Sequence, residues 1–249
     1  MNVFTYKDYI KCIHTLRLNA AFKLAEESSK YRSQKDNVED KKIIKKIMQD
    51  KNEMANFINE FLESREKIEN KNLIRFDSKY ISTRRKVDDD KLIYKLKNKD
   101  TIFIVDEVYE FDNIVLYEIL NYCISIMQEW NITNKIRGES KYPVIVPIII
   151  YAGTKKINNK SIQNKKQIGD YIFKNYNINL NYNLIDINKT SIEFLLKCNN
   201  LVAFGMILEK SKDKIELQNN LIKISEKNDK KFKKLVNYLN IKNLGCIKE

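Results

Sequence analysis

Carboxylates occur at two places in the 249-residue sequence where they could act together. Residues 88–90 are three aspartates just before an apolar run, and Asp106 and Glu107 close the next such run. Neighbouring strands lie about 5 Å apart, so acids at these positions could converge on one hard cation. Two carboxylates with open water positions suit Mg²⁺, which can generate a hydroxide nucleophile and neutralise a phosphodiester. The alternative is that the aspartates form a solvated turn.

The segments that carry these acids have the pattern of a β-hairpin. Residues 91–96 and 101–106 are short runs rich in Ile, Leu, Val, Tyr and Phe. The polar residues 97–100 join them, so the sequence predicts two paired strands with a turn between.

A helix and two more strands follow the predicted hairpin. Apolar residues recur at helical spacing over 114–130, and residues 143–151 are almost continuously apolar. The latter run indicates a strand buried on both faces, in which Pro147 predicts a bulge or an edge-facing position. Residues 181–187 read as another strand. The prediction is an α/β core.

Helical periodicity also precedes and follows this core. The predicted helices lie at 6–30, at 42–62 with a break near Asp50, at 200–210 and at 213–227, followed by a basic amphipathic tail from 228. Thr190 or Ser191 is expected to cap a further helix. We therefore predict an N-terminal helical segment packed on the core (1–70), the core (71–190) and a C-terminal helical segment with a basic tail (191–249).

The composition limits the functional classes. The chain has 46 Lys+Arg against 33 Asp+Glu, which gives a formal charge of +13. This excess favours a polyanion partner. Part of it also reflects a general richness in Lys, Asn and Ile. No stretch approaches eighteen consecutive apolar residues, so no membrane span is expected. The first residues lack the layout of a signal peptide, and we expect a cytoplasmic protein.

The four cysteines are widely spaced and there is one His, which argues against disulfides and a zinc site. We predict reduced thiols, with two of them lying in apolar helical patterns, Cys123 and Cys198.

An ordered series of segments resembles the recombination-promoting nuclease/putative transposase family over roughly residues 5 to 225. The segments that carry the resemblance are 94–100, 103–106, 117–122, 143–153 and 184–187. The resemblance implies membership of the PD-(D/E)XK nuclease superfamily. Its fold is a mixed central sheet flanked by helices, a restriction-endonuclease-like core, here with N- and C-terminal helical segments. It further implies DNA as partner and Mg²⁺ or Mn²⁺ as cofactor if the protein is active, and no cofactor otherwise.

The family's signature is an Asp at the start of one strand and an acid-His-Gln triplet at the end of the next. In this sequence Lys91 stands in the slot of the first acid and Asp106 in that of the second. Glu107 replaces the His, Val108 replaces the Gln, and Glu118 lies where many members have Arg.

These departures bear on the implied activity. Strand side chains alternate between faces, so Asp106 and Val108 share one face and Glu107 points to the other. Lys91 in a metal slot would repel Mg²⁺. Either Asp90 swings in where the strand begins, or Lys91 becomes the cation that contacts a phosphate.

Two hypotheses therefore stand. In a DNA endonuclease, Asp106 and Asp90 would hold the metal, Glu107 would act as auxiliary acid or base, and Lys91 would stabilise the transition state. In the alternative, the chain is a non-catalytic DNA-binding or protein-interaction module that retains the fold. In both, the basic cluster that adjoins the site is the expected DNA contact: Arg84, Arg85 and Lys86.

Overall fold

The computed structural model of the chain describes residues 43–62, 66–76, 91–97, 99–133, 142–157 and 181–238. These fall into two compact units: one is built from the segments up to residue 65 and from residue 189 onward, and the other spans Glu66–Asn188. The helical segments that the sequence separates into an N-terminal and a C-terminal part thus belong to one unit. That the N-terminal segment packs on the core stays a prediction.

The unit that spans Glu66–Asn188 is a five-stranded mixed sheet with strand order β1-β2-β3-β4-β5. β1, β2 and β3 are antiparallel neighbours, whereas β3, β4 and β5 run parallel. Its elements are the 3-10 helix η2 (Asn70–Asn72), β1 (Leu73–Arg75), β2 (Leu92–Leu96), β3 (Thr101–Val108), α4 (Asn113–Thr133), β4 (Val144–Tyr151) and β5 (Asn183–Asp186). The α/β fold with a mixed central sheet is therefore confirmed.

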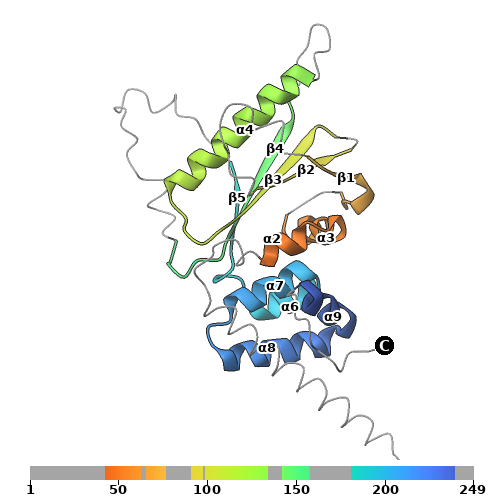
Figure 1. Cartoon of the computed structure of the whole chain (residues 1–249), viewed down its shortest axis with the longest axis vertical. Helices are drawn as coiled ribbons and strands as arrows, with labels where there is room; N and C mark the ends of the chain where they lie inside the picture. The colour runs from red at the N-terminus through yellow and green to blue at the C-terminus, as the bar shows by residue number, and fades with distance from the viewer. Residues whose placement is uncertain are drawn as a thin grey trace, which may run out of the picture. The chain divides into compact units, whose positions relative to one another are not determined.

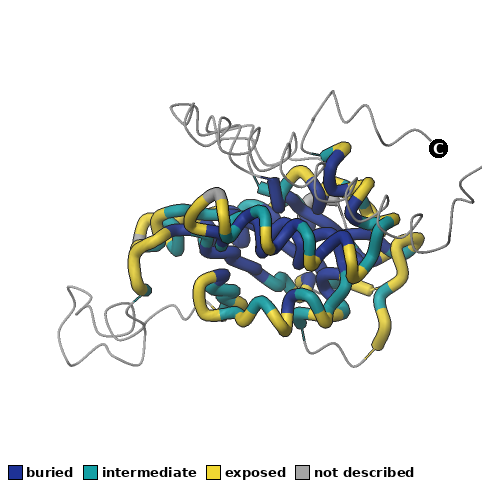
Figure 2. Tube along the Cα trace, turned by 90° about the horizontal axis from the view of Figure 1, so that it is seen from below, coloured by how far each residue is buried: buried dark blue, intermediate teal, exposed yellow. Residues whose placement is uncertain are grey.

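Helix α4 connects β3 to β4 and lies along one face of the sheet (Figure 1). Alternation along the strands selects the residues that face it. The shared core contains, from the strands, Ile93, Ile102, Ile104 and Ile149, and from α4, Ile119, Tyr122, Cys123, Ile126 and Trp130. Within the sheet, burial is concentrated along β2, β3 and the second half of β4, whereas β1 and β5 are mostly exposed or half-buried. Figure 2 shows the buried stretches of the chain in dark blue.

The strand boundaries agree with the apolar runs to within two residues. Pro147 pairs with Ile104 of β3, while β5 joins β4 only from Ile148 onward. The proline therefore meets a partner strand on one side only, as the missing N–H requires. Strand β1 was not predicted, because three residues of which two are exposed show no alternation.

The other unit is helical. It contains α2 (Ile43–Met48), α3 (Lys51–Phe61), α6 (Ile192–Cys198), α7 (Leu201–Lys210), α8 (Lys214–Lys227) and α9 (Asp229–Tyr238). Helix α7 is buried over 201–208, and α2, α3, α6, α8 and α9 all pack against it or against each other. The predicted break at Asp50 is the N-cap of α3, and Ser191 caps α6 by accepting from the N–H of Phe194 at 3.1 Å.

Candidate functional site

The hairpin places Lys91 directly opposite Asp106. Leu92 pairs with Val105, so the residue before Leu92 and the residue after Val105 meet on the same face of the sheet. Lys91 Nζ lies 2.6 Å from Asp106 Oδ2, and the two side chains are only 8% and 6% exposed. This is a short, charge-assisted hydrogen bond in a largely water-excluded position.

Helix α4 completes the surroundings of the ammonium. Glu118 Oε2 lies 3.6 Å from Lys91 Nζ, and the ring of Tyr122 has its centroid 5.0 Å from the same nitrogen. Residues four apart share a helix face, so one side of α4 presents both groups to the strand ends. The ammonium therefore has an acid from β3, a second acid from α4 and an aromatic face beside it.

Glu107 lies on the opposite face of the sheet from Asp106. It pairs in register with Ile150, is 2% exposed, and accepts a hydrogen bond at 3.3 Å from the hydroxyl of Tyr109. The sheet separates the two carboxylates, so the structure does not bring Asp106 and Glu107 to one ion.

Val108, in the family's Gln slot, shares the α4 face with Asp106 and packs against the apolar core. It offers neither a donor nor an acceptor side chain to water or phosphate.

The remaining predicted site residues lie outside the described residues. They are the acid Asp90 and the expected DNA contacts Arg84, Arg85 and Lys86. Within the described ranges, no group of three or more His, Cys, Asp or Glu side chains could hold a metal ion.

Among the described residues, the groups around Asp106 do not fit Mg²⁺. Mg²⁺ takes oxygen ligands at about 2.0–2.1 Å, whereas here the carboxylate is bonded to an ammonium at 2.6 Å. A cation placed on Asp106 would face the charge of Lys91 in a low-dielectric setting, where repulsion is strong.

The sequence-based site did not include Tyr122 and did not assign a contact to Glu118. The available signal was their four-residue spacing on a predicted helix that follows the hairpin. The pairing of Lys91 with Asp106 could also be counted from the turn, since positions equidistant from a hairpin turn face each other.

The fold and the site define an α/β protein whose central hairpin ends in a buried lysine–aspartate pair. Comparison with known families goes further: the chain belongs to the family described as "Putative transposase, YhgA-like", whose model matches residues 39–236. The match runs from before α2 into α9, and so covers nearly all the described residues. Neither a curated protein nor a solved structure matches the chain significantly.

Proposed function

We propose that this chain is a DNA-binding member of its transposase family in which an internal ion pair has replaced the catalytic metal. The observation that carries the proposal is the 2.6 Å contact between Lys91 Nζ and Asp106 Oδ2, in the two slots where the family's signature has its metal-binding acids. On this account the protein binds DNA but does not hydrolyse it with Mg²⁺ or Mn²⁺.

The buried ion pair resists replacement by a metal. Breaking a buried pair by removing one partner costs about 3–5 kcal/mol, because a charge is left uncompensated. A divalent ion would have to displace Lys91 from Asp106 and leave the ammonium with Glu118, which is half exposed and 3.6 Å away. The site is therefore arranged to keep its own cation.

DNA binding is supported by the family and by charge. A transposase acts on DNA, and a chain of formal charge +13 can gain affinity by releasing the counterions condensed on phosphates. Such binding needs neither metal nor hydrolysis.

The competing function is the Mg²⁺-dependent DNA endonuclease that the family resemblance implies, with Asp106 as the retained acid. Purified protein incubated with supercoiled plasmid and Mg²⁺ or Mn²⁺, beside Asp106→Asn, separates the two functions. We expect no nicking by either protein. Nicking by the wild type that Asp106→Asn abolishes would establish the endonuclease and overturn the non-catalytic account.

DNA binding has its own test. Fluorescence anisotropy with a labelled duplex, repeated from about 50 to about 300 mM salt, is expected to give an affinity that falls linearly on a log–log plot. Undetectable or salt-insensitive binding would remove DNA as the partner and leave a protein-interaction module.

A further inference from the structure

Helix α9 presents opposite faces of different character. Phe232, Leu235 and Val236 are buried in the helical unit, while Lys230 and Lys234 are exposed on the other side. The apolar face is already used for packing, so what α9 offers to a partner is its lysines.

The basic surface continues into the end of α8. Asn228 joins the helices: its N–H donates to the carbonyl of Ile224, and its side-chain oxygen accepts from the N–H of Lys231 at 3.0 Å. This residue therefore ends α8 and caps α9, which fixes the last turn of one helix against the first turn of the next. The exposed lysines on these turns and along α9 form what we call the α9 lysine face: Lys227, Lys230, Lys233 and Lys234.

Acids neutralise this face only in part. Residues 226–234 contain five lysines and two acids, a local charge of +3. Asp229 pairs with Lys233 at 3.4 Å, both about half exposed, and the other acid is the exposed Glu226. Exposed pairs of this kind are weak, so Lys233 and its neighbouring lysines remain available to a phosphate.

The position of the charges is unfavourable for the helix itself. Lys230 lies in the first turn of α9, where the helix dipole disfavours a cation. A lysine there does not add to the stability of the helix.

A lipid surface fits this helix poorly. Basic helices that bind membranes bury an apolar face in the lipid. In α9 that face is Phe232, Leu235 and Val236, which are 2%, 0% and 4% exposed. A polyanion that meets lysines alone, along a rigid rod of phosphates, matches the surface better.

We infer that the α9 lysine face contacts the phosphates of duplex DNA, an assignment that rests on the proposed function and adds the surface that performs it. Contacts of this type position the duplex and set the salt dependence without reading its sequence. The α9 lysine face is separate in sequence from the residues expected to contact DNA beside the site, 84–86.

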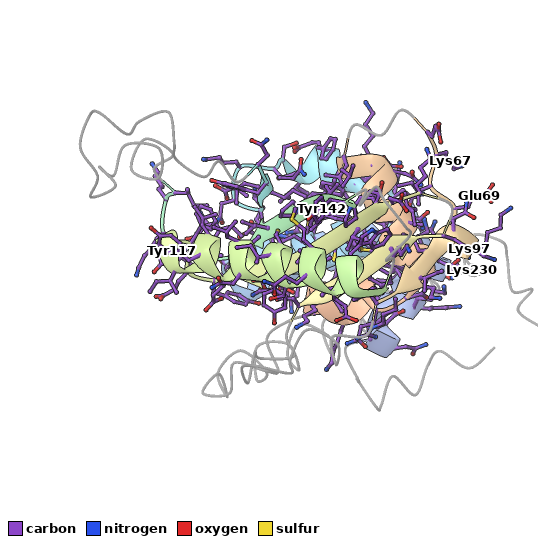
Figure 3. All side chains as sticks on the ribbon, turned by 90° about the horizontal axis from the view of Figure 1, so that it is seen from above. Lys67, Glu69, Lys97, Tyr117, Tyr142 and Lys230 are labelled. Atoms are coloured by element: carbon purple, nitrogen blue, oxygen red, sulfur yellow. The ribbon has the colours of Figure 1, made fainter. Side chains whose placement is uncertain are left out.

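The test replaces the α9 lysine face by glutamine in one variant (Lys227→Gln, Lys230→Gln, Lys233→Gln and Lys234→Gln). A matched control removes four exposed lysines from the sheet unit, Lys67, Lys71, Lys97 and Lys99, each changed to Gln. Lys67 and Lys97 are labelled in Figure 3, and Lys71 and Lys99 pair with Glu69 and Glu66. Both variants lose the same formal charge, and circular dichroism verifies that both fold.

We expect the face variant to weaken duplex binding at least about tenfold and to lower the salt slope by up to about 3.6, because each phosphate that the protein no longer neutralises reduces the slope by about 0.9. The control is expected to keep most of the wild-type slope. Equal weakening in the two variants would show a general charge effect and overturn the assignment.

The remaining outcomes are also decisive. If the wild type does not bind DNA at all, the proposed function itself fails. This outcome differs from one in which the wild type binds and the face variant binds equally well. Retained binding with an unchanged slope would overturn only the assignment. Tighter binding to single-stranded RNA or to phosphatidylserine vesicles than to the duplex, abolished in the face variant, would overturn DNA as the occupant.

Discussion

At the scale of single residues, the central feature is the pairing of Lys91 with Asp106. The resemblance implies two metal-binding acids at the positions of Lys91 and Asp106, and the structure joins these two residues at 2.6 Å. Two acids there would repel each other unless a cation lay between them. Lys91 supplies a positive charge beside Asp106 from within the chain.

The first prediction concerns the stability that this pair provides. Lys91→Met is expected to lower the free energy of unfolding by about 3–5 kcal/mol, because it leaves the Asp106 carboxylate buried without its partner. Urea unfolding followed by the fluorescence of Trp130, the single tryptophan, reports on the sheet unit that contains both residues.

The matched control is Lys99→Met, which removes an exposed pair with Glu66. Those side chains are 52% and 73% exposed, and a loss of no more than about 1 kcal/mol is expected. Equal losses from both substitutions would contradict the account of Lys91. The double variant Lys91→Met/Asp106→Leu should lose less than Lys91→Met, because no charge is left unpaired.

Thiol reactivity gives a second prediction at this scale. Burial raises the pKa of Cys123 in α4 from 9.0 to about 11. The thiolate fraction at mildly alkaline pH is then about a hundredfold smaller than in the unfolded chain, and alkylation, which needs the thiolate, should slow accordingly. Mass spectrometry of the peptide that contains Cys123, with and without urea, measures this ratio.

The raised pKa of Cys123 also makes the stability of the folded state depend on pH. A thiol whose pKa is higher in the folded state favours folding below pH 9.0 and ceases to do so as the pH rises through about 11. Equal native and unfolded alkylation rates would contradict the burial of Cys123.

At the scale of elements, Gly153 allows the chain after β4 to approach closely the chain after β3. A Cβ on Gly153 would overlap the carbonyl oxygen of Tyr109, a backbone atom that cannot turn aside. Asn188 donates to the Gly153 carbonyl at 2.6 Å and so connects the segment after β5 to the same place. The strand ends beside the Lys91–Asp106 pair therefore depend on this close approach.

The third prediction follows from that contact. Gly153→Ala is expected to destabilise the protein by about 1–3 kcal/mol, because the backbone must move to admit the methyl group. Gly205→Ala in α7 is the control: its Cβ would meet the Cδ1 atom of Ile47 at 3.1 Å, the end of a flexible side chain, and alanine is favoured in a helix by about 1 kcal/mol. Thermal unfolding compares them, and a Gly153→Ala protein as stable as Gly205→Ala would contradict the close approach.

Elements with a strong local signal could be predicted from sequence. The β2–β3 hairpin, β4 and α4 follow from the pattern of apolar residues. The sequence also predicts a break near Asp50, which is the N-cap of α3, and a helix capped by Thr190 or Ser191, of which Ser191 is the cap. Strand β1 could not be predicted, because its three residues become a strand only through pairing with β2.

In the candidate site too, local patterns could be predicted and contacts between distant segments could not. Alternation along β3 correctly separates Asp106 from Glu107. The four-residue spacing of Glu118 and Tyr122 places them on one helix face. That this face meets Lys91 depends on the packing of the helix on the sheet, which no local pattern encodes.

At the scale of the whole molecule, two compact units divide the proposed tasks. The sheet unit carries the buried pair, and the helical unit carries the α9 lysine face. No helix within the described segments is both long and apolar enough to cross a membrane. In the proposed function, the formal charge of +13 acts through particular surfaces rather than as a total.

The division has a consequence for DNA binding. Because the proposed binding does not use the metal site, the duplex affinity should not rise when Mg²⁺ is added. It should stay level or fall, because Mg²⁺ competes with lysines for the phosphates. Anisotropy in EDTA and in Mg²⁺ buffers checks this. An affinity that rises about tenfold with Mg²⁺ and loses that gain in Asp106→Asn would contradict it.

The most direct test of the central claim is Mn²⁺ binding measured by electron paramagnetic resonance on the wild type, Lys91→Asp and Lys91→Asp/Asp106→Asn. The account predicts no saturable site at Asp106 in the wild type, because Lys91 occupies the position of the ion. It predicts a new site of one Mn²⁺ per chain in Lys91→Asp that disappears when Asp106→Asn is added. Stoichiometric Mn²⁺ binding by the wild type that Asp106→Asn alone abolishes would contradict the claim that an ion pair has replaced the metal.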